Sequence, residues 1–256
     1  MSSPSILVNR DAEGLAHAVA ARLITKLVDV QSSGEIAHVV LTGGRVAAVV
    51  YRAVAESPAR SAIDWRRVEF WWGDERFLPD GDPERNETQA RDAFLSRVQV
   101  DPARVHPMPA DSGQGPEAAA DAYAAELAAA AGPGDHNGVP TFDVLMLGVG
   151  PDGHVASLFP EHPELQVDDR SVVAVHDAPK PPPTRISLTF PALSRAREVW
   201  FVVSGEDKAK AVSLALSGAD PLQIPAAAVK GLDRTLWLLD EPAASEIPDT
   251  IRGSRA

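Results

Sequence analysis

The stretch Phe142–Pro160 constrains the fold more than any other part of the sequence. It opens with a short apolar run, Val144–Leu147, which is typical of a strand buried on both faces of a parallel sheet. Three glycines and a proline fall within positions 148–153, so the strand must end in a tight turn that a ligand can approach closely. Helical spacing resumes near His154, which predicts that its imidazole lies in the first turn of a helix. In open α/β sheets ligands bind at this edge, where helix N-termini favour anions.

Asp152 and His154 flank Gly153 on this turn, and no bulky neighbour shields them. Most histidines in soluble proteins are surface or structural groups, but His is also the side chain that titrates near neutral pH. A turn this bare, at a ligand-binding edge, favours a chemical role over a structural one. His154 is therefore a candidate for acid–base chemistry.

A second pattern of strand, loop and helix occurs nearer the start of the chain. The strand predicted at Ile36–Leu41 ends in Thr42–Arg45, and an apolar helix is expected at Val46–Ala55. Paired glycines between a strand and a helix leave amide protons free, which is how a backbone binds phosphate. A plain tight turn is the alternative explanation for Gly43 and Gly44, because two glycines alone carry little information.

The strand predicted at Val68–Trp72 is followed by a run of charged residues at positions 74–76. Charges after a buried strand often do no more than return the chain to water, and a functional cluster is the alternative. Further along, a helix is expected at Glu87–Val98. Asn86 is most simply the N-terminal cap of that helix.

The remaining apolar segments complete an α/β pattern. Most predicted strands precede a helix, which favours a three-layer αβα fold with a mostly parallel sheet. No obvious linker interrupts the chain, so residues 1–256 are expected to form a single domain. In a parallel sheet the loops that follow the strands emerge at one edge, where they can share one cleft. Further strands are expected at Ile6–Val8 (an edge), Val172–Val175, Thr184–Phe190, Val199–Val203 and Leu236–Leu239 (closing the sheet), and further helices after a cap at Asp11, at Glu117–Ala131 and at Ala209–Leu216.

Composition narrows the classes of partner. The net charge of -12 would be repelled by nucleic acid and by an anionic membrane, so an anionic substrate would need a local positive pocket. The absence of cysteine excludes disulfides and thiol nucleophiles and fits a cytoplasmic protein. The chain has no run of about 18 apolar residues that would span a membrane. Met1–Val8 lacks the pattern of a signal peptide, and the polar tail beyond Glu246 is expected to be frayed.

Three common types of site do not fit the sequence. His154 and His162 are separated by Pro160 and lack helical i, i+4 spacing, and no third ligand is evident, so no metal site is expected. The glycine turn lacks the downstream acidic residue of a dinucleotide site, so no nicotinamide or other cofactor is expected. No Gly-x-Ser-x-Gly elbow is present, which removes the usual route of serine esterases.

Four segments, in the order Leu41–Arg45, Trp71–Phe77, Leu147–Pro160 and Val199–Val212, share their pattern with a known family. Through them the chain resembles the 6-phosphogluconolactonases, within a larger group of sugar-phosphate isomerases and deaminases. The resemblance extends to the ending Leu236–Pro242, so it covers nearly the whole chain. It implies the Rossmann-like fold of the NagB, RpiA and CoA-transferase group.

The resemblance implies hydrolysis of 6-phospho-D-glucono-1,5-lactone to 6-phospho-D-gluconate, the second step of the oxidative pentose phosphate pathway. Opening the ester requires a base that takes a proton from water and an acid that protonates the leaving oxygen, and one histidine can do both. His154 is the expected base, and either Asp74 or Asp152 is expected to orient the imidazole or the water. Backbone amides at the helix start, with Arg76, are expected to hold the oxyanion.

The same resemblance implies a set of residues that bind the substrate, mainly through its phosphate, whose geometry guanidinium groups match. Arg45 departs from the family pattern, in which a small hydroxyl residue commonly follows the paired glycines. If Arg45 points outward, Arg185 and Lys208 are left to hold the phosphate. The implied substrate-binding residues are Gly43, Gly44, Arg45, Arg76, Asn86, Gly153, Arg185 and Lys208.

Two alternative functions remain open at the level of sequence. Glucosamine-6-phosphate deaminases share the Gly-x-Asp-Gly-His core but usually continue into a Phe-Asn-Glu-Pro type segment, where this chain has Ser157–Pro160. A non-catalytic sugar-phosphate sensor would normally add a basic DNA-binding segment, for which neither terminus has the room or the charge. We expect a monomer that binds a small phosphorylated sugar lactone and that has no nucleic-acid or membrane partner.

Overall fold

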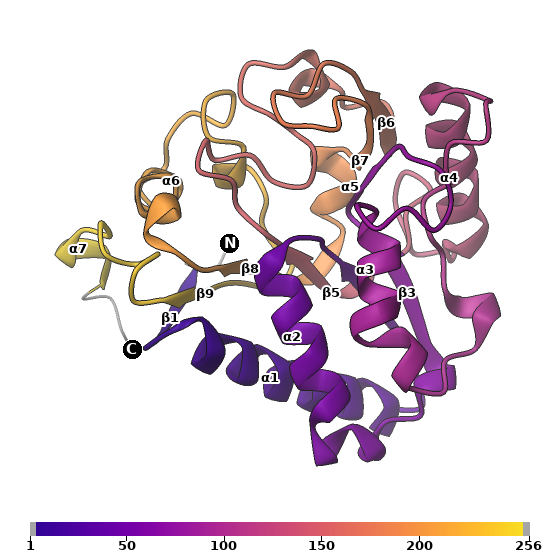
Figure 1. Ribbon diagram of the computed structural model, residues 1–256, viewed down its shortest axis with the longest axis horizontal. Helices are drawn as coiled ribbons and strands as arrows, with labels where there is room; N and C mark the ends of the chain where they lie inside the picture. The colour runs from indigo at the N-terminus through magenta and orange to yellow at the C-terminus, as the bar shows by residue number, and fades with distance from the viewer. Residues whose placement is uncertain (1–3, 253–256) are drawn as a thin grey trace.

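The computed structural model describes residues 4–252, and a six-stranded parallel sheet forms its centre (Figure 1). The strands lie in the order β1-β9-β8-β5-β2-β3, and each neighbouring pair is parallel, which confirms the predicted fold class. The prediction that Leu236–Leu239 closes the sheet is wrong, because β1 pairs with the outer side of β9 and is itself the edge. The strands are β1 (Ser5–Asn9), β2 (Ala37–Leu41), β3 (Val68–Trp72), β5 (Phe142–Leu147), β8 (Ala196–Val203) and β9 (Arg234–Asp240).

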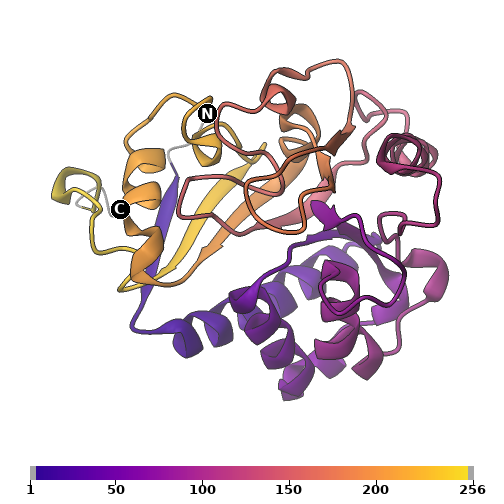
Figure 2. The same cartoon turned by 45° about the horizontal axis from the view of Figure 1, so that its top comes forward.

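Helices cover both faces of this sheet, with α1 and α2 on one face and α5 and α6 on the other (Figures 1 and 2). Asp11 caps α1 as predicted, since its Oδ1 accepts a hydrogen bond from the Gly14 amide at 2.8 Å. The helices are α1 (Ala12–Ser32), α2 (Arg45–Glu56), α3 (Asn86–Ala93), α4 (Pro116–Ala130), α5 (Phe190–Leu193), α6 (Ala209–Leu216) and α7 (Asp249–Arg252). Short 3-10 helices lie at Pro58–Ala62, Trp65–Arg67, Leu95–Arg97, Pro102–Arg104, Pro163–Gln166, Glu206–Lys208 and Pro225–Ala227.

Within residues 4–252, no helix combines the length and the apolar character needed to cross a membrane. The expectations of no signal peptide and of a frayed tail fall partly on residues 1–3 and 253–256, which lie outside the described residues. Of that tail, residues 249–252 form α7.

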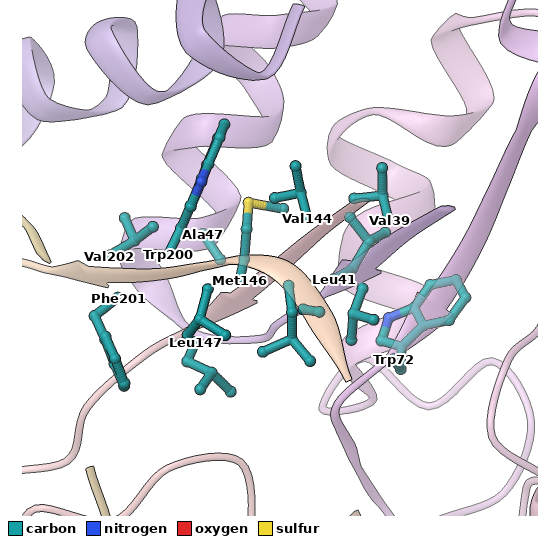
Figure 3. Packing of buried hydrophobic residues seen from close by; sticks show 14 of the residues in the cluster. Val39, Leu41, Ala47, Trp72, Val144, Met146, Leu147, Trp200, Phe201 and Val202 are labelled. Carbon is teal, nitrogen blue, oxygen red and sulfur yellow. The ribbon is translucent and has the colours of Figure 1, made fainter. Parts of the chain in front are cut away.

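The apolar strands alternate their side chains between the two faces, as Figure 3 shows. Met146 and Trp200 point to the face covered by α1 and α2, whereas Leu147 and Phe201 point to the opposite face. All four are at most 1% exposed, so these strands are buried on both sides. This explains why they read as continuous apolar runs rather than as alternating ones.

A second sheet, which the sequence did not predict, lies beside the carboxyl edge of the first sheet. It is antiparallel, in the order β4 (Asp74–Arg76), β7 (Arg185–Leu188) and β6 (Val172–Val175). β4 begins directly after Gly73, whose carbonyl accepts a hydrogen bond from the Leu188 amide at 2.9 Å. The strand predicted at Thr184–Phe190 is therefore shorter than expected, because Phe190 already begins α5.

The helix predicted at His154 is absent, and residues 151–160 form irregular turns instead. Gly153 and Ala156 have φ of 84° and 49°, values that a right-handed helix does not allow. The Gly153 amide donates to the Gly150 carbonyl at 2.9 Å, and Val155 and Leu158 form an isolated bridge. His154 is thus held by a folded turn and not by a helix.

Candidate active site

A cavity of about 520 Å³ lies at the carboxyl edge of the parallel sheet. The loops that follow β2, β5 and β8 line it, together with β4, the start of α3 and the segment around Lys180. This is the convergence that the parallel strands predicted. The cavity brings together nine of the residues singled out from sequence, namely Gly43, Gly44, Arg45, Asp74, Arg76, Asn86, His154, Arg185 and Lys208.

The lining of this cavity is rich in positive charge, although the whole chain carries a net charge of -12. Its carboxylates are those of Asp74 and Asp207. Its cations outnumber them and are Arg45, Arg76, Lys180, Arg185 and Lys208. This is the local positive pocket that an anionic substrate requires.

His154 is bound through one ring nitrogen to Asp152. Its Nδ1 lies 2.5 Å from Asp152 Oδ1, and its ring packs 4.6 Å from that of Phe159. Since a carboxylate only accepts hydrogen bonds, Nδ1 carries the proton and Nε2 keeps its lone pair. Within the part of the chain that the structure describes, no group bonds Nε2. This geometry suits a general base.

The charge of Asp152 is maintained by its neighbours. Burial raises the pKa of the Asp152 carboxyl, but the hydrogen bond and charge of His154, with the charge of Lys180, hold this pKa well below its usual range. Lys180 Nζ lies 3.5 Å from Asp152 Oδ1 and 3.5 Å from His154 Nδ1. Asp152 is therefore ionised at any physiological pH and does not itself line the cavity.

Gly150 and Gly153 of this turn each require glycine, but for different structural reasons. A Cβ at Gly150 would lie 2.0 Å from His154 Nδ1 and 2.3 Å from Asp152 Oδ1, so the pair occupies the space of the missing side chain. Gly153, which was expected to bind substrate, is not part of the cavity lining. It packs under Ile224, and its carbonyl accepts from the Ala226 amide at 3.0 Å. Its positive φ is what the turn needs.

Lys180 also lines this cavity, although it was not among the residues predicted from sequence. Arg185 explains its position: the guanidinium donates from Nη2 to the carbonyls of Lys180 and Pro181 and from Nε to that of Pro182, at 3.0–3.2 Å. Arg185 also lies over the ring of Phe159, 5.6 Å from its centroid. The sequence feature that could have pointed to Lys180 was a cation followed by a stiff proline segment that leads to Arg185.

Asp74 is not the partner of His154. Its Oδ2 accepts from the buried Ser157 hydroxyl at 2.6 Å, and its Oδ1 lies 3.4 Å from Asn86 Nδ2. The prediction that Asn86 caps α3 is wrong, because Arg85 occupies the cap position and the Asn86 side chain donates to the Asp74 carbonyl at 2.9 Å. Asn86 thus ties α3 to β4 at the wall of the cavity.

Another part of the cavity wall, which we call the phosphate end, is built on the N-terminus of α2. Gly44, with φ of 99°, is its cap residue and no side chain satisfies the first amides, which are free to bind an anion. Tyr51 fixes Thr42, two residues before Gly44, since its hydroxyl bonds the amide and the carbonyl of Thr42 at 2.9 and 2.6 Å. Lys208 binds Asp207 at this end, and Arg45 is exposed at its rim.

Residues 4–252 contain no cluster of histidine, aspartate and glutamate with the arrangement of a metal site. The chain contains no cysteine that could add to one.

Comparison with known proteins identifies the family. The family model described as glucosamine-6-phosphate isomerases/6-phosphogluconolactonase matches residues 10–237. The chain therefore belongs to this family. A 6-phosphogluconolactonase of Streptomyces coelicolor is 60% identical over 252 residues, 97% of each chain. One of Mycobacterium tuberculosis is 47% identical over 249 residues, which cover 96% of this chain and 99% of that protein.

Solved structures show the same fold. The 6-phosphogluconolactonase of Thermotoga maritima superposes with a TM-score of 0.80 at 28% identity, over 93% of this chain and 100% of that one. A monomeric glucosamine-6-phosphate deaminase superposes with a TM-score of 0.75 at 19% identity, over 94% and 99%. The fold is thus common to both activities of the family, and the choice between them depends on the sequence relatives and on the site.

Proposed function

We propose that this chain hydrolyses 6-phospho-D-glucono-1,5-lactone to 6-phospho-D-gluconate, as its close relatives named 6-phosphogluconolactonase do. The observation that carries this proposal is the His154–Asp152 pair at a cavity rich in cations. A base with a free Nε2 and a positive binding site match a neutral ester that carries a phosphate. The product of this step is the 6-phosphogluconate of the oxidative pentose phosphate pathway.

His154 moves one proton in each half of the reaction. Its Nε2 takes a proton from water as the water oxygen attacks C1, and Asp152 stabilises the imidazolium that forms. The bond between C1 and the ring oxygen then breaks, and the ring oxygen takes the proton from Nε2. The new carboxylic acid loses its own proton to solvent, so the imidazole returns to its starting state.

The charged residues divide into two groups in this proposal. Lys180, whose Nζ lies 3.5 Å from His154 Nδ1, and Arg76, which also lines the cavity, hold the oxyanion that develops at C1. The helix start that was expected to supply amides after Gly153 is absent, so side chains take that role. The phosphate is held by the free amides after Gly44, by Lys208 and by Arg185, which lies next to Lys180. Arg45 adds charge at the rim.

Replacing His154 tests the base directly. With fresh lactone, acid release above the spontaneous rate is expected for the wild type, and kcat of His154→Asn is expected to fall at least 100-fold, about the value of general base catalysis. Affinity for 6-phosphogluconate should change little. His162→Asn is the control, because His162 also packs near Phe159 but does not line the cavity. Normal turnover in His154→Asn would remove the base role.

Replacing Lys208 tests the phosphate end. Lys208→Ala is expected to raise KM roughly tenfold with a smaller change in kcat, since it removes one charged contact to phosphate. Lys210→Ala, which removes an exposed lysine two residues after Lys208 that does not line the cavity, is the control. If both variants keep the wild-type KM, the phosphate binds elsewhere.

The same assays decide between this activity and the alternatives. Ammonia release from glucosamine 6-phosphate would indicate a deaminase, and lactone binding without turnover would indicate a sensor. We also propose that the enzyme acts as a cytoplasmic monomer without a bound cofactor, as the lack of cysteine and the family resemblance suggest. A sedimentation velocity experiment at micromolar protein tests the monomer.

A further inference from the structure

Glu75 lies between two residues of the cavity wall but faces away from it. Side chains alternate along β4, so Asp74 and Arg76 line the cavity while Glu75 points into the protein. Its side chain is 0% exposed. A buried carboxylate beside a site, and not in it, needs an explanation, because burying a charge is costly unless it is paired and hydrogen-bonded.

The Glu75 carboxylate binds both ends of the loop that follows β4. Oε1 accepts from the amides of Arg76 and Asn86 at 2.8 and 2.6 Å, and Oε2 accepts from the amide of Glu87 at 2.9 Å. The first amides of α3, which no side chain of its own cap satisfies, are thus bonded by a residue from β4.

Arg85 completes this arrangement from the loop itself. Its Nη2 lies 3.8 Å from Glu75 Oε2, and its guanidinium donates to the carbonyls of Leu78 and Met108 at 3.2 and 2.7 Å. Burial raises the pKa of Glu75, and the value remains at about 7 even though Arg85 and the three amides act to lower it. Every neighbour is a donor or a cation, so the carboxylate is the form that this environment satisfies. Buried ion pairs add little net stability over apolar packing, which favours a role in fixing one arrangement.

The segment fixed by Glu75 carries Asn86, which connects two walls of the cavity. Asn86 Nδ2 donates to the Asp74 carbonyl at 2.9 Å. Its Oδ1 lies only 1.8 Å from where a Cβ of Gly43 would be, so Asn86 fills the space that this glycine leaves open. A shift of Asn86 would therefore displace β4 relative to His154 and leave the space beside Gly43 unfilled.

We infer that Glu75 is a positioning residue, which sets the wall formed by Asp74, Arg76 and Asn86 against His154. The inference rests on the proposed lactone hydrolysis. Removing the charge should displace this wall while the phosphate end stays intact, since Tyr51 holds Thr42 independently of Asn86. The loss should therefore appear in kcat for the lactone and not in affinity for inorganic phosphate.

Glu75→Gln is the test. The glutamine amide has the shape of the carboxylate, but its NH2 group would have to face the hydrogen-bond donors that bind Glu75. We expect kcat to fall roughly 10- to 100-fold, as misplacement of about 1 Å does, with the inhibition constant of inorganic phosphate within about threefold of wild type. Glu198→Gln is the matched control, since Glu198 is also buried and accepts from Lys26 and Trp200 at 2.9 Å, outside the cavity. It should lose stability and keep wild-type kcat. If Glu75→Gln does not fold, Glu75→Asp, whose shorter side chain cannot reach both ends of the loop, replaces it with the same expectation.

A double-mutant cycle with Asn86→Ala tests whether Glu75 affects kcat through Asn86. If Glu75 acts through Asn86, the double variant should have nearly the kcat of Asn86→Ala alone. Fully additive losses, or a wild-type kcat in a folded Glu75 variant, would overturn the inference. An inactive wild type would overturn the proposed function instead, and the two failures are thus distinct.

Discussion

At position 150 the site depends on the absence of a side chain. The His154–Asp152 pair occupies the volume that a Cβ would need. No such restriction applies at Gly148, which also lines the cavity but whose Cβ would meet no atom within 4 Å among the described residues. The two glycines look alike in the sequence, and only the folded turn distinguishes them.

Gly150→Ala is expected to reduce kcat/KM at least 100-fold, because the methyl group displaces the imidazole from its partner by more than about 1 Å. Gly148→Ala is the matched control, for which kcat/KM should stay within a few-fold of wild type. The measurement is lactone hydrolysis at a temperature at which both variants are folded by circular dichroism. Equal activities would show that the turn adapts to the extra carbon.

The sequence predicted His154 and left its partner undecided between Asp74 and Asp152. Spacing alone could not decide, because both carboxylates follow strands that end at the same edge. Gly153 resolves it: its positive φ folds the chain back so that Asp152 reaches Nδ1. The local pattern around Lys180 could not place it in the cavity, since its position depends on how Arg185 binds the carbonyls of residues 180–182.

The ends of β2 and β3 are each fixed by a buried tyrosine, and these are the two tyrosines of the chain. The Tyr51 hydroxyl bonds both backbone groups of Thr42, just after β2. The Tyr123 hydroxyl bonds both backbone groups of Trp72, at the end of β3, at 2.9 and 3.3 Å. Each strand can therefore leave the sheet at a defined residue and enter the cavity wall.

Tyr51→Phe is expected to lower the free energy of unfolding by roughly 1–2 kcal/mol, because two backbone groups lose a buried partner. KM for the lactone should rise a few-fold, since Thr42 and the glycines after it line the cavity. Tyr123→Phe should be destabilised to a similar degree with less effect on KM, as Trp72 is not part of the lining. Urea titrations and steady-state kinetics of both variants measure these effects.

The apolar strands of the central sheet were predictable from sequence, whereas β4 and the turn at His154 were not. Apolar runs such as Val68–Trp72 identify strands because burial on both faces leaves no other choice of residue. β4 contains only three residues, all charged, so nothing in its sequence marks it as a strand. It forms because β7 pairs with it, and the false helix at His154 likewise arose from spacing that two positive φ values override.

At the scale of the molecule, an imidazole that does not line the cavity, that of His106, links the central sheet to α4. His106 lies 2.7 Å from Glu69 on β3 and 2.6 Å from Glu126 on α4, and its ring stacks on Trp71 with centroids 3.8 Å apart. Although burial lowers it, the hydrogen bonds to Glu126 and Glu69 raise the pKa of His106 from 6.5 to about 9. The charged imidazolium is therefore the form that joins these layers.

Because the folded pKa of His106 is raised, its stabilisation is complete below pH 6.5 and is lost as the pH rises through about 9. We expect the free energy of unfolding to fall by roughly 1–2 kcal/mol over this range, after allowance for solvent around the partly exposed Glu126. His106→Phe, which keeps the stacking on Trp71, should lack this slope. Urea titrations at several pH values measure it, and identical slopes in both proteins would contradict the assignment.

In the sheet the first strand to be synthesised, β1, lies beside the last one, β9. β1 pairs residue by residue with β9, from Ser5 with Leu236 to Asn9 with Asp240. During synthesis, β1 leaves the ribosome long before its neighbour β9 exists. A nascent chain that stops short of Arg234 therefore carries a strand with unpaired edges, which is prone to aggregation. Completion of the sheet must therefore wait until β9 has been synthesised.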